Sequence, residues 1–177
     1  IAQIEYDWLN SFLMQGGLVD MTEHGINDYK DSFTAGAWRD VSSGDSVYAV
    51  PVDLGPVGMW YRQDLFDKHG IGVPTTWDEY AAAAKQLSDA TGGETLIGNF
   101  APNGQGQHYA FLDQAGAKPF EFDNSNPTEI SINHNDEASK KVFDYWIDLV
   151  DQDLVGTDQA WTPEFSTALG TGKYATA

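Results

Sequence analysis

The second half of the chain alternates apolar stripes of helical period with short apolar runs. Between residues 76 and 91, apolar side chains recur at positions i, i+3, i+4 and i+7, which is typical of a helix that buries one face. These positions are Tyr80, Ala83, Ala84 and Leu87. Thr76 and Glu79 match a capping box, so we expect this helix to begin directly after Thr76.

The same period and the capping residues predict further helices. One helix is expected after Asp7 as N-cap, and another after Asn135 or Asp136 as N-cap. Two more are expected at 107–114 and at 163–169. A short helix is expected at 27–33. Short apolar runs at 95–98 and from Tyr174 onward predict buried strands. Because strands interleave with helices, the pattern predicts an α/β fold.

A bend separates the two halves of the chain. Residues 47–66 predict, in this order, a strand, a bend at Pro and Gly residues, a second strand and a short helix. A strand, a bend and a second strand are typical of a chain that crosses from one lobe to another. We therefore expect a hinge here. Trp60, inside the second strand, and Trp77, at a helix start, are expected in the core.

Charge narrows the classes of partner. The 177 residues carry 27 acidic and 9 basic side chains, a formal net charge of −18. Such a surface repels phosphate backbones and anionic lipids, which argues against nucleic acid and membrane surfaces as partners. The sequence starts at Ile1 without a basic and apolar leader, and we expect it to be part of a longer protein.

Motifs for catalysis, cofactors and metals are weak in this sequence. Gly170 to Lys173 lacks the remaining positions of a phosphate-binding loop, so a helix end is predicted there instead. Asp123 to Glu129 resembles a calcium loop, but Thr128 stands where that loop needs Gly, so we predict a polar turn. With no Cys, no Gly-x-Ser-x-Gly motif and four dispersed His, we expect no catalytic residues, no cofactor and no metal site.

Aromatic and amide side chains concentrate in the loops near the bend. Sugars present apolar C–H faces that rest on aromatic rings, and hydroxyls that need carboxylate and amide partners. The sequence therefore predicts a polyol ligand. The candidate contacts are Tyr6, Trp8, Asp53, Asn103, Gln105 and Gln107. Trp8 fits a packing role equally well.

The ordered motifs resemble a known family. They are Tyr48 to Asp53, Trp60 to Phe66, Gly70-Ile71, Pro74, Thr76 to Glu79, and Gly172 to Ala175. Together they resemble the extracellular solute-binding proteins of ABC importers, in the sugar-binding group related to maltose-binding protein. The resemblance covers nearly the whole chain.

The resemblance implies a two-lobed α/β fold that closes on its ligand. On this basis 1–52 is a remnant of the first lobe, 53–57 a hinge crossing, and 58–177 an incomplete second lobe. It adds Glu5 and Gly55 to the candidate contacts.

The implied function is to bind an extracellular carbohydrate and deliver it to the permease subunits of an ABC transporter, without catalysis. A monomer is expected in the periplasm or at the extracellular face of the membrane, held there only through an anchor outside this sequence. Two alternatives stay open: a secreted glycoside hydrolase or other carbohydrate-active domain, and a structural domain whose aromatic residues are all core.

Overall fold

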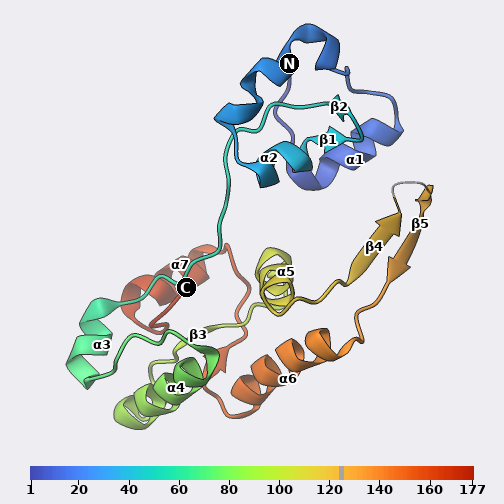
Figure 1. The fold of residues 1–177 in the computed structure, drawn as a ribbon. Coiled ribbons are helices and arrows are strands. Elements are labelled where there is room, and N and C mark those ends of the chain that lie inside the picture. The colour runs from blue at the N-terminus through green and yellow to red at the C-terminus, as the bar shows by residue number, and fades with distance from the viewer. Residues whose placement is uncertain (124–125) are drawn as a thin grey trace. The chain divides into compact units, whose positions relative to one another are not determined.

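A computed structural model describes residues 1–123 and 126–177. The chain forms two compact units, Ile1–Pro56 and Val57–Ala177, each with its own core. Helices and short strands follow one another in both, as the predicted α/β class requires (Figure 1). The assignment of residues 53–57 as a hinge stays a prediction.

The first unit consists of short elements. They are α1 (Tyr6–Met14), the 3₁₀ helices η1 (Thr22–His24) and η2 (Ile26–Ser32), α2 (Ala35–Asp40), β1 (Ser42–Ser43) and β2 (Ser46–Val47). β1 and β2 pair antiparallel. Their small core contains the buried side chains of Leu9, Ile26, Trp38, Val41 and Val47.

A carboxylate helps to join two distant segments of the first unit. Asp20 accepts a hydrogen bond from the Ser46 hydroxyl at 2.6 Å and another from the Thr22 backbone N–H at 2.9 Å. These bonds, led by that of Ser46, lower the pKa of Asp20 to about 2 because they favour the ionised form. Together with the bond from the Met21 N–H to the Val47 carbonyl at 2.9 Å, these bonds hold the segment before η1 against β2.

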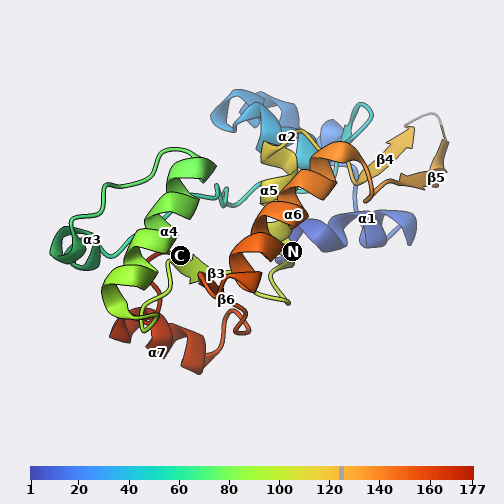
Figure 2. The same ribbon diagram turned by 90° about the horizontal axis from the view of Figure 1, so that it is seen from below.

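The second unit contains longer helices. Its elements are α3 (Gln63–His69), α4 (Trp77–Thr91), β3 (Gly98–Asn99), α5 (Gln105–Gln114), β4 (Phe120–Asp123), β5 (Asn126–Ile132), α6 (Glu137–Asp151), β6 (Val155–Gly156) and α7 (Pro163–Thr171). β3 and β6 pair in parallel and lie between α4 and α6 (Figure 2). The antiparallel pair β4 and β5 was not predicted.

Extended segments build the centre of the second unit. Leu96 forms a parallel bridge with Tyr174, and Tyr61 forms an antiparallel bridge with Thr176. With β3 and β6, these segments make a narrow sheet that helices cover. Gly98 is required there, because a Cβ at this position would clash with the Tyr80 hydroxyl and lie 2.9 Å from the Thr176 hydroxyl.

The predicted helix starts are confirmed for the two longest helices. The Thr76 hydroxyl accepts the Glu79 N–H at 3.2 Å, and Asp136 accepts the Ser139 N–H at 2.9 Å. The Glu79 carboxylate accepts from the N–H of Thr75 at 2.7 Å, one residue before the partner expected for a capping box. The predicted apolar face of α4 is buried as a whole.

Arg62 explains part of the motif that follows the bend. Its guanidinium donates to the carbonyls of Leu169 at 3.1 Å and Gly170 at 3.2 Å, which lie at the end of α7. It also bonds the Asp64 carboxylate at 2.7 Å and holds the pKa of that carboxyl below its usual range. Arg62 thus joins the start of α3 to the end of α7, which leads into the Tyr174 segment.

Three sequence expectations need correction or fall outside the description. α1 begins at Tyr6 and not after Asp7, because the Trp8 N–H already bonds the Glu5 carbonyl at 3.0 Å. Trp60 is 81% exposed and not in the core, since its only ladder partner is Ala177 and no second layer covers it in the described chain. The polar turn predicted for Asp123 to Glu129 includes residues 124–125, which lie outside the described residues.

Candidate functional site

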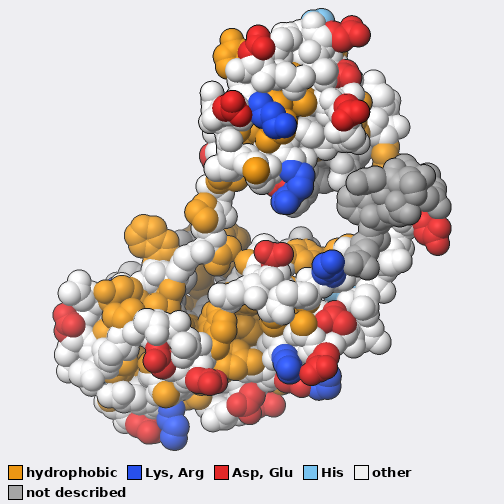
Figure 3. All heavy atoms as spheres, in the orientation of Figure 1, with side chains coloured by type: hydrophobic (Ala, Val, Ile, Leu, Met, Phe, Trp, Pro, Cys, Tyr) orange, Lys and Arg blue, Asp and Glu red, His pale blue; other side chains and the backbone are white. Residues whose placement is uncertain are grey.

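A groove of about 610 Å³ lies in the second unit, where the start of α4, the length of α5 and the ends of the central segments meet. In Figure 3 hydrophobic side chains gather in a hollow of this unit, with charged side chains around it. The residues that line the groove are Val57, Gly58, Met59, Trp77, Tyr80, Asn99, Gln107, Ala110, Phe111, Asp113, Gln114, Trp146, Thr176 and Ala177.

Aromatic rings form one wall of the groove. Trp77 is 39% exposed and makes edge-to-face contacts with Tyr80 at 5.6 Å and with Phe111 at 5.3 Å between ring centroids. Phe111 in turn stacks on Trp146 at 4.8 Å. The Trp77 indole N–H donates to Gln114 Oε1 at 2.9 Å, which fixes the ring at the edge of the groove. The expectation that Trp77 is a core residue is therefore wrong, because its helix start lies at this opening.

Polar side chains lie beside the aromatic wall. Gln107 donates through Nε2 to the Asn99 carbonyl at 3.2 Å. Asn99 bonds both backbone groups of Asp158, donating to the carbonyl at 2.8 Å and accepting the N–H at 2.9 Å. Asp113 and Gln114 add a carboxylate and a second amide. Hydroxyl-bearing ligands need this combination of donors and acceptors.

Tyr80 is held in the back of the groove by a chain of hydroxyls. Its oxygen lies 2.8 Å from the Thr176 hydroxyl, which donates to the Ile97 carbonyl at 2.7 Å. The Tyr80 hydroxyl is therefore the donor toward Thr176. Burial raises the pKa of Tyr80 to about 12, further above physiological pH than the ordinary value of 10.0, and the phenol is neutral.

The three site residues predicted in the second unit have different surroundings in the structure. Gln107 lines the groove. Asn103 instead bonds the backbone of Ala160, accepting its N–H at 2.9 Å and donating to its carbonyl at 3.3 Å. Gln105 is the exposed first residue of α5 and is not among the described residues that line the groove. Ligand contact by these residues stays a prediction.

In the first unit, three predicted residues share a small cavity. Glu5, Tyr6 and Asp53 line a space of about 80 Å³, and the Tyr6 hydroxyl donates to the Asp53 carbonyl at 3.0 Å. Trp8 is 62% exposed on α1; neither it nor Gly55 is among the described residues that line this cavity. With room for about three waters, the cavity is too small for a sugar ring.

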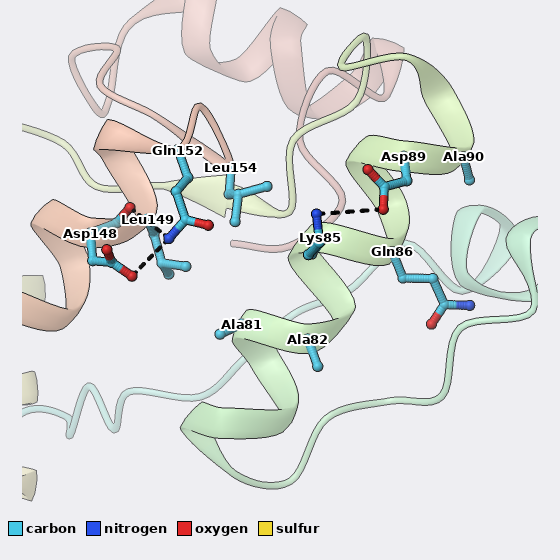
Figure 4. A pocket seen from close by; sticks show the side chains of 10 residues that line it. All are labelled: Ala81, Ala82, Lys85, Gln86, Asp89, Ala90, Asp148, Leu149, Gln152 and Leu154. Atoms are coloured by element: carbon cyan, nitrogen blue, oxygen red, sulfur yellow. Dashed lines mark hydrogen bonds and ion pairs between the residues drawn. The ribbon is translucent and has the colours of Figure 1, made fainter.

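A larger hollow of about 810 Å³ lies between α4 and α6 (Figure 4). Several of its polar groups are already paired: Lys85 lies 3.7 Å from Asp89 on α4, and Gln152, directly after α6, donates to Asp148 at 2.8 Å. None of the described residues that line it is aromatic. Despite its size it offers no stacking surface, and we favour the aromatic groove as the candidate site.

Sequence reasoning missed most of the groove. A signal was present on α5, where Gln107, Phe111 and Gln114 fall at i, i+4 and i+7 and so share one face. Asn99 directly follows the predicted strand at 95–98, the position where α/β sheets carry ligand contacts. Trp77 was detected but assigned to the core, because sequence alone does not show which helix start faces an opening.

No group of His, Cys, Asp or Glu side chains in the described ranges 1–123 and 126–177 is arranged to hold a metal ion. Among the helices of those ranges, none has the length and hydropathy needed to cross a membrane.

The second unit has short parallel strands, helices on both sides and a polar-aromatic groove. This arrangement matches one part of the two-lobed periplasmic binding proteins. Residues 1–175 match the sequence profile of the bacterial extracellular solute-binding proteins. The chain belongs to this family, which confirms the resemblance found in the sequence.

Individual relatives agree with this family. The chain is 31% identical to an ABC transporter associated binding protein from B. animalis subsp. lactis, solved in complex with β-1,6-galactobiose. That match has a TM-score of 0.85 and covers 98% of this chain and 42% of that chain. The lacto-N-biose-bound binding protein of Bifidobacterium longum, 24% identical with a TM-score of 0.76 over 99% of this chain and 48% of that one, shows the same fold.

A curated relative matches over a shorter stretch. The arabinooligosaccharide-binding protein of Halalkalibacterium halodurans is 29% identical over 96 residues, which are 52% of this chain and 21% of that protein. The chain therefore spans less than half the length of the relatives it matches.

Proposed function

We propose that this chain belongs to an extracellular binding protein that captures a small carbohydrate for an ABC importer. The observation that carries the proposal is the groove of about 610 Å³, in which an aromatic wall lies beside amide and carboxylate groups. Its volume falls in the range of small-molecule sites, roughly 300–1,000 Å³. The rings of Trp77 and Phe111 offer apolar faces to sugar C–H groups, while Gln107 and Asp113 face the hydroxyls.

The relatives support a carbohydrate over other solutes. A protein 31% identical to this chain was solved with β-1,6-galactobiose, and a curated relative is named for arabinooligosaccharides. We expect a ligand of one or more neutral sugar rings. The sugar would be bound without a chemical step.

Transport would follow from conformational selection. A ligand that contacts both lobes of the family fold only in the closed form shifts the population toward that form, and permease subunits of the transporter then recognise it. The binding protein would act as a monomer at the extracellular face of the membrane or in the periplasm, with any membrane attachment through an anchor outside residues 1–177.

A glycoside hydrolase is the weaker candidate. Hydrolysis in most such enzymes needs two carboxyl groups across the scissile bond. Asp113 is the one carboxyl among the described residues that line the groove. Glu5 and Asp53 do share a cavity, but its volume of about 80 Å³ is too small for a sugar.

Calorimetric titration of the full-length protein with mono- and oligosaccharides tests this proposal. We expect at least one neutral sugar to bind, and Gln107→Ala to weaken binding about tenfold by removing a hydrogen-bonding amide. Lys85→Ala in the other hollow is the matched control and should bind as wild type. Binding of an amino acid or peptide in place of every sugar would contradict the carbohydrate assignment.

A further inference from the structure

Trp161 has an unusual backbone for a bulky residue. Its φ is 66°, in the left-handed region that Gly and Asn normally occupy, and its side chain is 91% exposed. A large aromatic residue in this region is a conformational outlier, and such outliers cluster at functional sites. Within residues 1–177 this ring buries little apolar surface, and such burial is what would compensate a strained backbone.

The loop that carries Trp161 is held on both sides of the residue. Asn103 bonds both backbone groups of Ala160, at 2.9 and 3.3 Å. Thr162 caps α7 by accepting the Phe165 N–H at 3.1 Å. The neighbours of Trp161 are thus fixed by side chains, and its Cα position is set before any ligand arrives.

The same loop is tied to the groove. Two residues before Ala160, the backbone of Asp158 is bonded by the Asn99 side chain at 2.8 and 2.9 Å, and Asn99 itself lines the groove. The loops that hold Asn103 and Trp161 follow the carboxyl ends of the parallel strands β3 and β6. Ligands of open α/β sheets bind at that end of the strands.

We propose that Trp161 is a second aromatic platform, which stacks on a sugar ring beyond the one held in the groove. This inference rests on the proposed function and adds to it that the ligand is an oligosaccharide of at least two rings. A Trp side chain on a fixed backbone has only two χ angles to order on binding, which is what makes such a residue an effective anchor. It would select for chain length, because only a longer ligand reaches it.

A length series of one sugar tests the proposal. The full-length wild type, Trp161→Ala and Trp161→Phe are titrated with the mono-, di- and trisaccharide. We expect Trp161→Ala to lower affinity for the longer sugars about 3–10-fold and to leave that for the monosaccharide unchanged, while Trp161→Phe keeps most of the affinity. Trp60→Ala is the matched control: Trp60 is similarly exposed in the same unit but is not among the described groove-lining residues.

Two further measurements separate the outcomes. Trp161→Gly, which suits the positive φ, should melt at or above the wild-type temperature and still lose affinity for the longer sugars, so misfolding cannot account for the loss. Acrylamide should quench the fluorescence of an exposed tryptophan in the wild type, and this signal should be missing in Trp161→Phe. The longest sugar should protect that tryptophan of the wild type from quenching.

Equal affinities of wild type and Trp161→Ala along the whole series would overturn the inference and leave the proposed function standing. If Trp161→Ala bound every sugar normally but lost transport, the inference would also be overturned, because Trp161 would then contact the transporter. Failure of the wild type to bind any sugar would overturn both.

Discussion

The two units of the chain are stabilised in different ways. The second unit has a large apolar core, with Trp146 only 4% exposed, and long helices with side-chain caps at Thr76 and Asp136. The first unit has a small core, short 3₁₀ and α-helices, and a carboxylate, Asp20, that connects distant segments. The second unit thus has the larger buried core, and the first unit has the smaller one. The groove of about 610 Å³ lies in the second unit.

The largest expected effect comes from the core of the second unit. Trp146→Ala removes a buried ring that stacks on Phe111 and on Phe100, whose centroid lies 5.2 Å away, and should lower the free energy of unfolding by about 3–5 kcal/mol. Amide hydrogen exchange measured by mass spectrometry would show faster exchange in α4 and α6.

Leu9→Ala is the matched change in the first unit and should cost about 3 kcal/mol there. If the cores are separate, Leu9→Ala speeds amide exchange in α1 and leaves that in α6 unchanged. Trp146→Ala then speeds exchange in α6 and leaves that in α1 unchanged. Equal acceleration in both units by either variant would show that the division is wrong.

Helix caps should give smaller effects, of about 1 kcal/mol or less. Thr76→Ala removes the acceptor of the Glu79 N–H and should destabilise α4 by about 1 kcal/mol in urea denaturation. Within the described residues the Glu5 side chain makes no capping bond at α1, so Glu5→Ser should stabilise the protein by about 0.5 kcal/mol. A loss of stability in Glu5→Ser would mean that Glu5 has a structural role that its exposed position does not reveal.

Sequence reasoning succeeded where the signal is local. The cap at Thr76, the apolar face of α4 and the Gly172 end of α7 each depend on residues within a few positions, and all were predicted. It failed where the partner is distant in sequence. Trp60 was placed in the core because nothing local shows that its strand has a single partner, and the bonds of Asn103 to Ala160, 57 positions away, were not foreseen.

Acid should weaken the first unit through Asp20. Its pKa is about 2 in the folded chain, below its ordinary value of 3.8, so the stabilisation is present above pH 4 and is lost as the pH falls toward 2. In Asp20→Asn, the thermal unfolding of the first unit should depend less on pH in this window.

The exposed Asp45→Asn, one residue from Ser46, is the control and should leave the wild-type pH dependence of that transition in place. An unchanged pH profile in Asp20→Asn would contradict the role of Asp20.

The central claim is that sugar binds in the aromatic groove of the second unit. It is tested most directly by ¹⁹F NMR of the full-length protein labelled with 5-fluorotryptophan, with the resonances of the six tryptophans of this chain assigned by single Trp→Phe variants. We predict that a bound sugar shifts the Trp77 and Trp146 resonances, which report on the groove, and leaves the buried Trp38 of the first unit unchanged. Sugar binding without any shift at Trp77 and Trp146 would contradict the account.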